Sequence, residues 1–71
     1  MSGQYRNDIA IGAVVDIVQK ADQPTGRLTR GRVSQILTNK EYHSRGIKVR
    51  LQSGEIGRVQ QIIQAEEEDF Q

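Results

Sequence analysis

Cysteine and tryptophan are absent from this sequence, and proline and histidine each occur once. Without cysteine, the chain can form neither a disulfide nor a thiolate metal site, and one histidine cannot build a zinc site alone. The absence of cysteine fits a reducing compartment, and the polar residues 1–7 do not resemble a secretory signal. No apolar run approaches the roughly 20 residues that span a bilayer. We therefore expect a cytoplasmic protein that carries no metal or cofactor and has no membrane partner.

The net charge of +1 conceals an uneven distribution of charge along the 71 residues. Two cations and three acids give −1 over residues 1–24, whereas eight cations and two acids give +6 over residues 25–58. Residues 59–71 hold four acids and no cation, giving −4. A concentration of cations is typical of proteins that neutralise nucleic-acid phosphates, although a charged face is also the ordinary surface of a soluble domain. We expect residues 65–71 to form a flexible acidic tail that either solvates the domain or competes with phosphate for the basic region.

Short β-branched segments separated by glycine-containing turns predict an all-β fold. The expected strands cover residues 13–20, 31–38, 47–51 and 56–63. The segment Ile47–Leu51 alternates apolar and cationic residues, which is typical of a strand with one buried face. We expect residues 8–64 to form one small antiparallel barrel of four to five strands, with residues 1–7 as a flexible arm before it. The predicted core contains Val15, Ile17, Val33, Val49 and Leu51.

Three features of the basic region predict local structure. Leu28 is the one large apolar residue of its loop, so we expect its side chain to anchor the loop to the core. Gly26 and Gly31 can adopt positive φ without a steric penalty, which favours tight reversal of the backbone at both positions. Val33 and Ile36 are three apart, which breaks the strand alternation and favours a β-bulge.

The sequence resembles the KOW motif of SH3-like barrels at seven positions: Gly12, Val15, Ile17, Gly26, Gly31, Val33 and Ile36. That motif occurs in ribosomal proteins and transcription elongation factors, so the resemblance implies an SH3-like barrel. Residues 18–59, including the run Gly46–Leu51, also resemble the YwbE family of small bacterial proteins. This second resemblance implies a single domain and no particular chemistry.

The candidate binding residues are six cations of the basic region: Arg27, Arg30, Arg32, Lys48, Arg50 and Arg58. Arginine binds phosphate bidentately, and exposed charges of this kind contribute little to stability. We expect Arg30 and Arg32 to project together and to form one patch with the cations of Ile47–Leu51, if the second and third strands are neighbours. Of the three aromatic residues only Tyr42 lies in the basic region, which favours structured RNA over a single strand stacked on rings.

The predicted function is a non-catalytic module that binds nucleic acid, with structured or ribosomal RNA as the favoured partner. The alternative is a protein-interaction module that docks on an acidic partner or on a factor associated with the ribosome or with transcription. Catalysis by His43 is not expected, because no second catalytic group accompanies it, and no small-molecule substrate is indicated.

Overall fold

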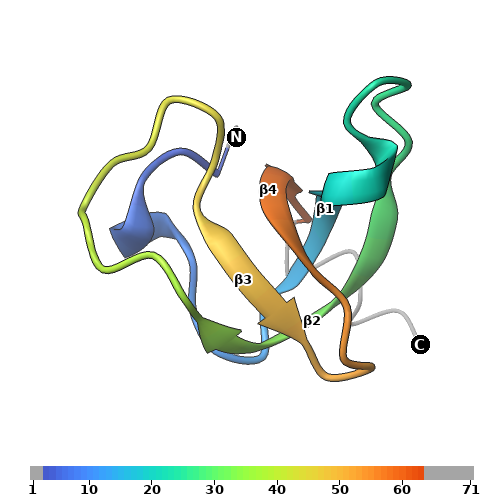
Figure 1. The fold of residues 1–71 in the computed structure, drawn as a ribbon. Helices are drawn as coiled ribbons and strands as arrows, with labels where there is room; N and C mark the ends of the chain where they lie inside the picture. Colours follow the sequence, from blue (N-terminus) through green and yellow to red (C-terminus); the bar gives the residue numbers. More distant parts are fainter. Residues whose placement is uncertain (1–2, 64–71) are drawn as a thin grey trace.

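The computed structural model describes residues 3–63, which form a closed antiparallel barrel of four strands (Figure 1). The strands are β1 (Val14–Gln19), β2 (Thr29–Ile36), β3 (Lys48–Leu51) and β4 (Ile56–Ile62). Two short 3₁₀ turns, η1 (Arg6–Asp8) and η2 (Lys20–Asp22), lie outside the sheet, and residues 3–63 contain no α-helix. The expected all-β barrel is therefore confirmed, and its size and strand count are consistent with a small SH3-like barrel. No helix in this part of the chain is long and apolar enough to cross a membrane.

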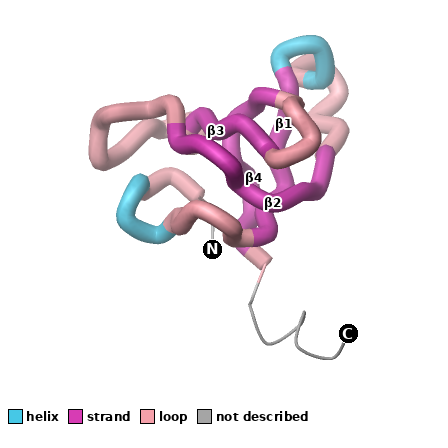
Figure 2. Tube along the Cα trace, turned by 90° about the horizontal axis from the view of Figure 1, so that it is seen from below, coloured by secondary structure: helices cyan, strands magenta, loops and turns pink. Residues whose placement is uncertain are grey.

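Every strand of the barrel pairs with two others. β1 pairs with β2 and β4, and β3 closes the barrel between the same two strands. Figure 2, turned by 90°, shows the strands surrounding one interior. The register of β2 against β3 shifts between Val33 and Gln35, an irregularity at the place where the sequence favours a bulge. A second shift interrupts the pairing of β1 with β4 between Asp16 and Ile17.

The core consists of the strand residues that face the barrel interior. All five aliphatic residues expected there are at most 1% exposed. They are joined by Ile9, Ile47 and Val59. Leu28, by contrast, is 49% exposed, so the expectation that it anchors its loop is wrong. Leu28 has the same parity as Arg30, which faces outward from β2, so the two-residue period of the strand directs Leu28 away from the core.

The two glycines of the basic region have different roles. Gly26 has a φ of 75°, as expected for a turn, whereas Gly31 lies within β2 and does not have positive φ. The expectation that the backbone reverses at Gly31 with positive φ is therefore wrong. A Cβ atom at Gly31 would lie 2.8 Å from Cδ1 of Leu51, closer than packed side chains approach one another. A side chain at this position would have to displace the end of the buried Leu51 side chain, so the filled interior of the barrel favours glycine there.

The N-terminal residues 3–6 differ from the flexible arm that the sequence predicts. This segment runs antiparallel to the loop before β3 and exchanges backbone hydrogen bonds with it. The donors and acceptors are Ile47 N–H to Gly3 O, His43 N–H to Gln4 O and Arg6 N–H to Glu41 O. Because these bonds satisfy backbone groups on both segments, residues 3–6 belong to the folded domain. Residues 1–2 of the predicted arm and the predicted acidic tail, residues 65–71, lie outside the described residues.

Candidate nucleic-acid interface

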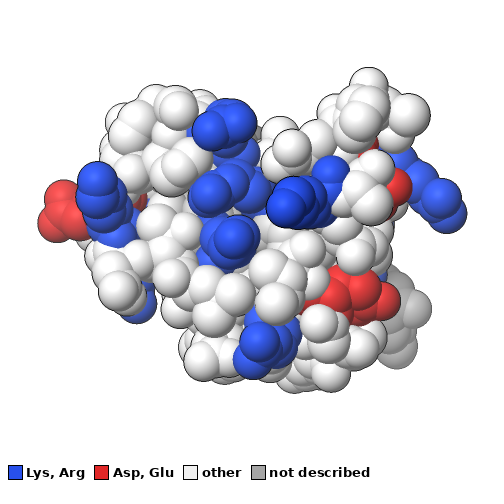
Figure 3. Space-filling view, viewed as in Figure 1, with Lys and Arg blue, Asp and Glu red and all other residues white. Residues whose placement is uncertain are grey.

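Two adjoining hollows lie on the outer surface of β1, β3 and β4. They share Val18, Gln23 and Arg58, and their volumes are about 470 and 380 Å³. We define the basic groove as these two hollows together. Its cations are Lys20, Arg45, Lys48 and Arg58. Figure 3 shows Lys and Arg side chains gathered in the middle of this face.

The charge of the basic groove is of one sign. Among the described residues, no aspartate or glutamate lines either hollow. The remaining lining is neutral, with Gln23, Ser44 and Gln60 as further polar residues. A concave surface lined by cations alone concentrates positive potential and attracts polyanions.

Strand register places two of these cations opposite each other. Lys48 of β3 is the direct partner of Arg58 of β4, and both alternate with core residues along their strands. Arg58 in turn pairs with Val18 of β1, so Val18 forms the floor of the groove beside it. The Arg58 guanidinium donates from Nη1 to the carbonyl oxygen of Gly46 at 3.1 Å, which holds it at the groove. Like charges directly opposite on neighbouring strands destabilise a sheet, so this pair opposes folding.

The imidazole of His43 responds to the same positive potential. Partial burial, followed by the positive charges of Arg58, Arg45 and Lys40, lowers the pKa of His43 from its usual value of 6.5. The neutral ring accepts the Arg45 backbone N–H at Nδ1, with 3.1 Å between the nitrogens. The lowered pKa and the acceptor role both indicate an uncharged imidazole beside the groove.

Of the six predicted cations, only Lys48 and Arg58 lie in the basic groove. Arg30 lies on β2 and forms a bidentate ion pair with Asp16 of β1, at 2.8 and 3.1 Å. Arg32, two residues further along β2, donates from Nη1 to the carbonyl oxygen of Gly12 at 2.8 Å. These two arginines therefore hold contacts over β1 and β2, outside the groove.

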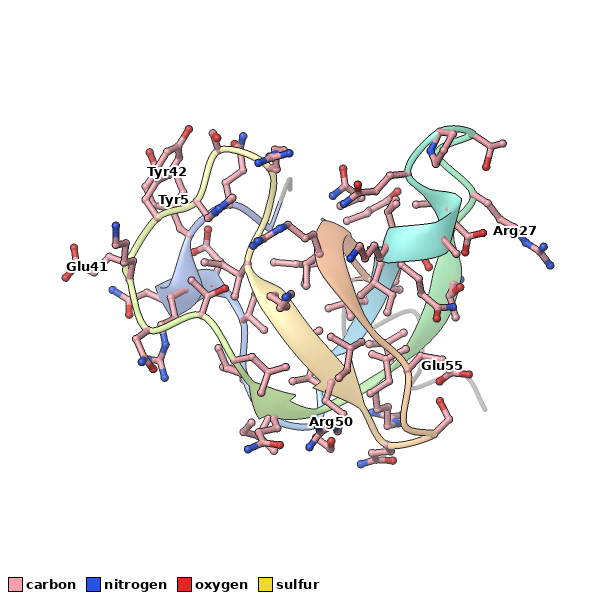
Figure 4. The ribbon with its side chains drawn as sticks, viewed as in Figure 1. Tyr5, Arg27, Glu41, Tyr42, Arg50 and Glu55 are labelled. Atoms are coloured by element: carbon pink, nitrogen blue, oxygen red, sulfur yellow. The ribbon has the colours of Figure 1, made fainter. Side chains whose placement is uncertain are left out.

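The other two predicted cations lie at separate ends of the barrel. Figure 4 shows Arg27 extending outward beside the β1–β2 hairpin and Arg50 at the lower end of the view. Arg50 donates from Nη1 to Oε1 of Gln35 at 2.8 Å. The second and third strands are neighbours, as expected, but their register places Arg50 opposite Gln35 and not opposite Arg30. The six cations consequently do not form the single patch that the sequence predicts.

Lys20 and Arg45 belong to the groove although the sequence did not single them out. Lys20 begins η2 and Arg45 lies in the loop before β3. The alternation of apolar and polar residues, which predicts that Lys48 faces outward from its strand, gives no such prediction for residues in turns and loops. Only the closure of β1 on β4 brings Lys20 and Arg58 to one surface.

Comparisons with known proteins identify a family and a relative from one bacterium. The sequence model of the family described as "Uncharacterized conserved protein (DUF2196)" matches residues 2–62. The chain is also 62% identical over 63 residues to "Uncharacterized protein YwbE" of Bacillus subtilis (strain 168). That match covers 89% of this chain and 97% of the relative. No solved structure matches the chain.

Proposed function

The chain belongs to this family of YwbE-like proteins, as its sequence predicts, and we propose that it is a non-catalytic module that binds RNA phosphates in the basic groove. One observation carries the proposal. Four cations from four separate segments line two adjoining hollows, and no described acid lines them. Arginine and lysine bind phosphate oxygens through charge-assisted hydrogen bonds, and neutralising the phosphates releases counterions.

The environment of the one histidine supports the non-catalytic part of the proposal. A general base is normally oriented by a hydrogen bond from one ring nitrogen while the other faces the substrate. In this chain, Nδ1 of His43 accepts a backbone N–H from Arg45, the second residue after it. This is a local loop contact, and it gives the imidazole no carboxylate partner through Nδ1.

The alternative partner, an acidic protein, would use the same four cations. The barrel is closed, so a partner that adds a strand to a free sheet edge has no such edge among the four strands. An acidic partner would therefore bind without adding a strand to the barrel. Direct competition between RNA and an acidic polypeptide distinguishes the two partners.

The test is fluorescence anisotropy of a labelled RNA hairpin, titrated with the full chain across a salt series. Roughly four phosphate contacts predict that log affinity falls against log salt with a slope of about −3 to −4. The double variant Lys48→Gln with Arg58→Gln should lower affinity at least about tenfold at low salt and reduce the slope by about half. Its matched control, Arg27→Gln with Arg32→Gln, removes the same charge outside the groove. Compared at about 0.1 M salt, where the screening length is about 10 Å, the control should cost no more than about threefold.

Three results would contradict the proposal. The first is no binding of the RNA hairpin by the wild-type chain at low salt, and the second is an equal loss of affinity in the control variant and the groove variant. The third is displacement of the RNA hairpin by polyglutamate at an equal concentration of charge, which would make the acidic-protein alternative the better account.

A further inference from the structure

Two of the three aromatic residues in the chain meet on its surface. The ring centroids of Tyr5 and Tyr42 are 5.0 Å apart, and the ring planes are inclined by 53°. A β-bridge joins the two residues, one from the N-terminal segment and one from the loop before β3. Tyr5 is 53% exposed and Tyr42 is 46% exposed. Rings that serve only a core are buried, whereas these two leave much of their surface open to a ligand.

The two segments that carry the tyrosines reach the edge of the basic groove. A third hollow of about 100 Å³ includes Gln4, Ser44 and Arg45, and Ser44 and Arg45 also line the groove. Tyr5 follows Gln4 directly, and Tyr42 precedes Ser44 by two residues. The side chain of Gln4 donates to the carbonyl oxygen of Ser44 at 2.8 Å, which joins the two segments. The groove is thus continuous with the segments that carry the rings.

Within three positions of either tyrosine the sequence holds three cations and two acids, so the local charge does not oppose a nucleic acid. The nearest acidic neighbour in sequence, Glu41, points outward at the edge of the molecule and away from the labelled tyrosines (Figure 4). On the other side, the pair is followed along the loop by His43 and by Arg45 of the groove. A strand whose phosphates occupy the groove would reach the rings if it continued along this loop, past Arg45 and His43.

We propose that the Tyr5–Tyr42 pair is a stacking platform for an unpaired base, so that the preferred ligand is RNA with a single-stranded segment. This inference rests on the proposed function and deepens it. Bases stack on exposed aromatic rings whatever their identity, because every base has a π-face. A base inside a duplex is already stacked on both faces and cannot reach the rings. The chain should therefore prefer a single strand or an overhang to a blunt duplex, which reverses the expectation drawn from the scarcity of aromatics.

The composition of the chain provides a direct readout. With no tryptophan and two tyrosines in the sequence, its intrinsic emission comes from the tyrosine pair. We would titrate the full chain with an oligouridylate of about eight nucleotides and with an abasic ribose-phosphate oligomer of the same length. Both oligomers carry the same phosphates, and only the first carries bases. Free uridine monophosphate at equal base concentration corrects for absorption of the exciting light.

The expected result is quenching of tyrosine emission by the oligouridylate alone, with affinity roughly five- to 150-fold tighter than for the abasic oligomer if one base stacks. Equal affinities without quenching would overturn the platform and leave the phosphate-binding groove in place. Failure of both oligomers to bind at low salt would overturn the proposed function, and the platform with it.

Two variants of one ring supply an independent check. Tyr42→Phe keeps a stacking ring and should keep the affinity for oligouridylate within about twofold, whereas Tyr42→Leu keeps only apolar bulk and should lose about fivefold or more. Binding of the abasic oligomer should be equal in both variants, which shows that the groove is intact. Equal oligouridylate affinity for the Phe and Leu variants would contradict the platform.

Discussion

Asp16 and Arg30 face each other on β1 and β2, and their side chains form a bidentate ion pair with a buried carboxylate and an exposed guanidinium. The Asp16 side chain is 7% exposed and the Arg30 side chain is 59% exposed. Removing one partner of the pair should therefore affect the free energy of unfolding differently from removing the other. Losing the cation would leave a buried charge uncompensated, whereas losing the carboxylate would return an arginine to water.

The first prediction follows from this asymmetry. Arg30→Gln should destabilise the fold by roughly 1–3 kcal/mol, and Asp16→Asn by less, because only the first change strands a buried charge. Urea unfolding at neutral pH measures both. An unchanged urea midpoint for Arg30→Gln would contradict this prediction. It would instead support the expectation from the sequence that Arg30 is an exposed charge with little effect on stability.

The second prediction concerns Lys48 and Arg58, the like-charged pair that faces across β3 and β4. Lys48→Glu converts a repulsive cross-strand pair into an attractive one and should stabilise the fold by about 0.2–1 kcal/mol. The same change should weaken RNA binding, since it places an acid in the basic groove. The melting temperature of the variant should therefore rise while its RNA affinity, measured by anisotropy, falls. A variant that loses both stability and affinity would contradict a groove maintained for binding.

The third prediction concerns the packing of Gly31 on Leu51. Gly31→Val should destabilise by roughly 1–3 kcal/mol, because the added atoms overpack a filled interior. Leu51→Val removes the Cδ1 atom that the new side chain would meet. In a double-mutant cycle, the combined variant should therefore lose less than the sum of the single changes. Strict additivity of the two effects would show that the contact is not the cause.

The fourth prediction concerns pH. The folded state lowers the pKa of His43 below its usual 6.5, through partial burial and then the nearby cations. The unfolded chain consequently takes up a proton on His43 at higher pH than the folded chain. The part of the stability that depends on His43 is therefore constant above about pH 7 and falls as the pH drops through 6.5 and below. His43→Gln should flatten this loss in a series of urea midpoints. An identical pH dependence of variant and wild type would assign the loss to other groups.

The fifth prediction concerns the acidic residues 65–71, which lie outside the described residues, so that it rests on charge alone. Deleting them removes four negative charges and should tighten RNA binding at low salt. The gain should fade towards 1 M salt, where screening shortens to about 3 Å. Equal affinities of the full and shortened chains at low salt would leave the tail a solvating role only.

The fold was predictable where strand alternation decides burial. Val49 and Leu51 alternate with cations, and both are buried. The bounds of the strands were less predictable. β2 begins at Thr29, two residues before the expected start, because its pairing with β1 extends to Ile17 opposite Thr29. That extension depends on the partner strand, which the local pattern of β2 does not contain.

The site was predictable only in part, because register and chain closure decide which side chains meet. Lys48 and Arg58 were found through the alternation of their strands. The carboxylate of Asp16 was not connected to Arg30, although the pair lies directly across β1 and β2. The sequence likewise does not indicate that Tyr5 and Tyr42 meet, since nothing in their spacing shows that residues 3–6 lie along the loop before β3.

The closure of the barrel also has a consequence for how the chain folds during synthesis. Residues 15–19 of β1 pair with residues 57–62 of β4, which is synthesised after the other three strands of the barrel. Until that strand has left the ribosome, β1 lacks one of its two partners and β3 lacks one of its own. Non-local pairing of this kind delays folding until the distant segments can meet. The nascent domain should therefore become resistant to protease in one late step, after residue 62 emerges, and not progressively with chain length.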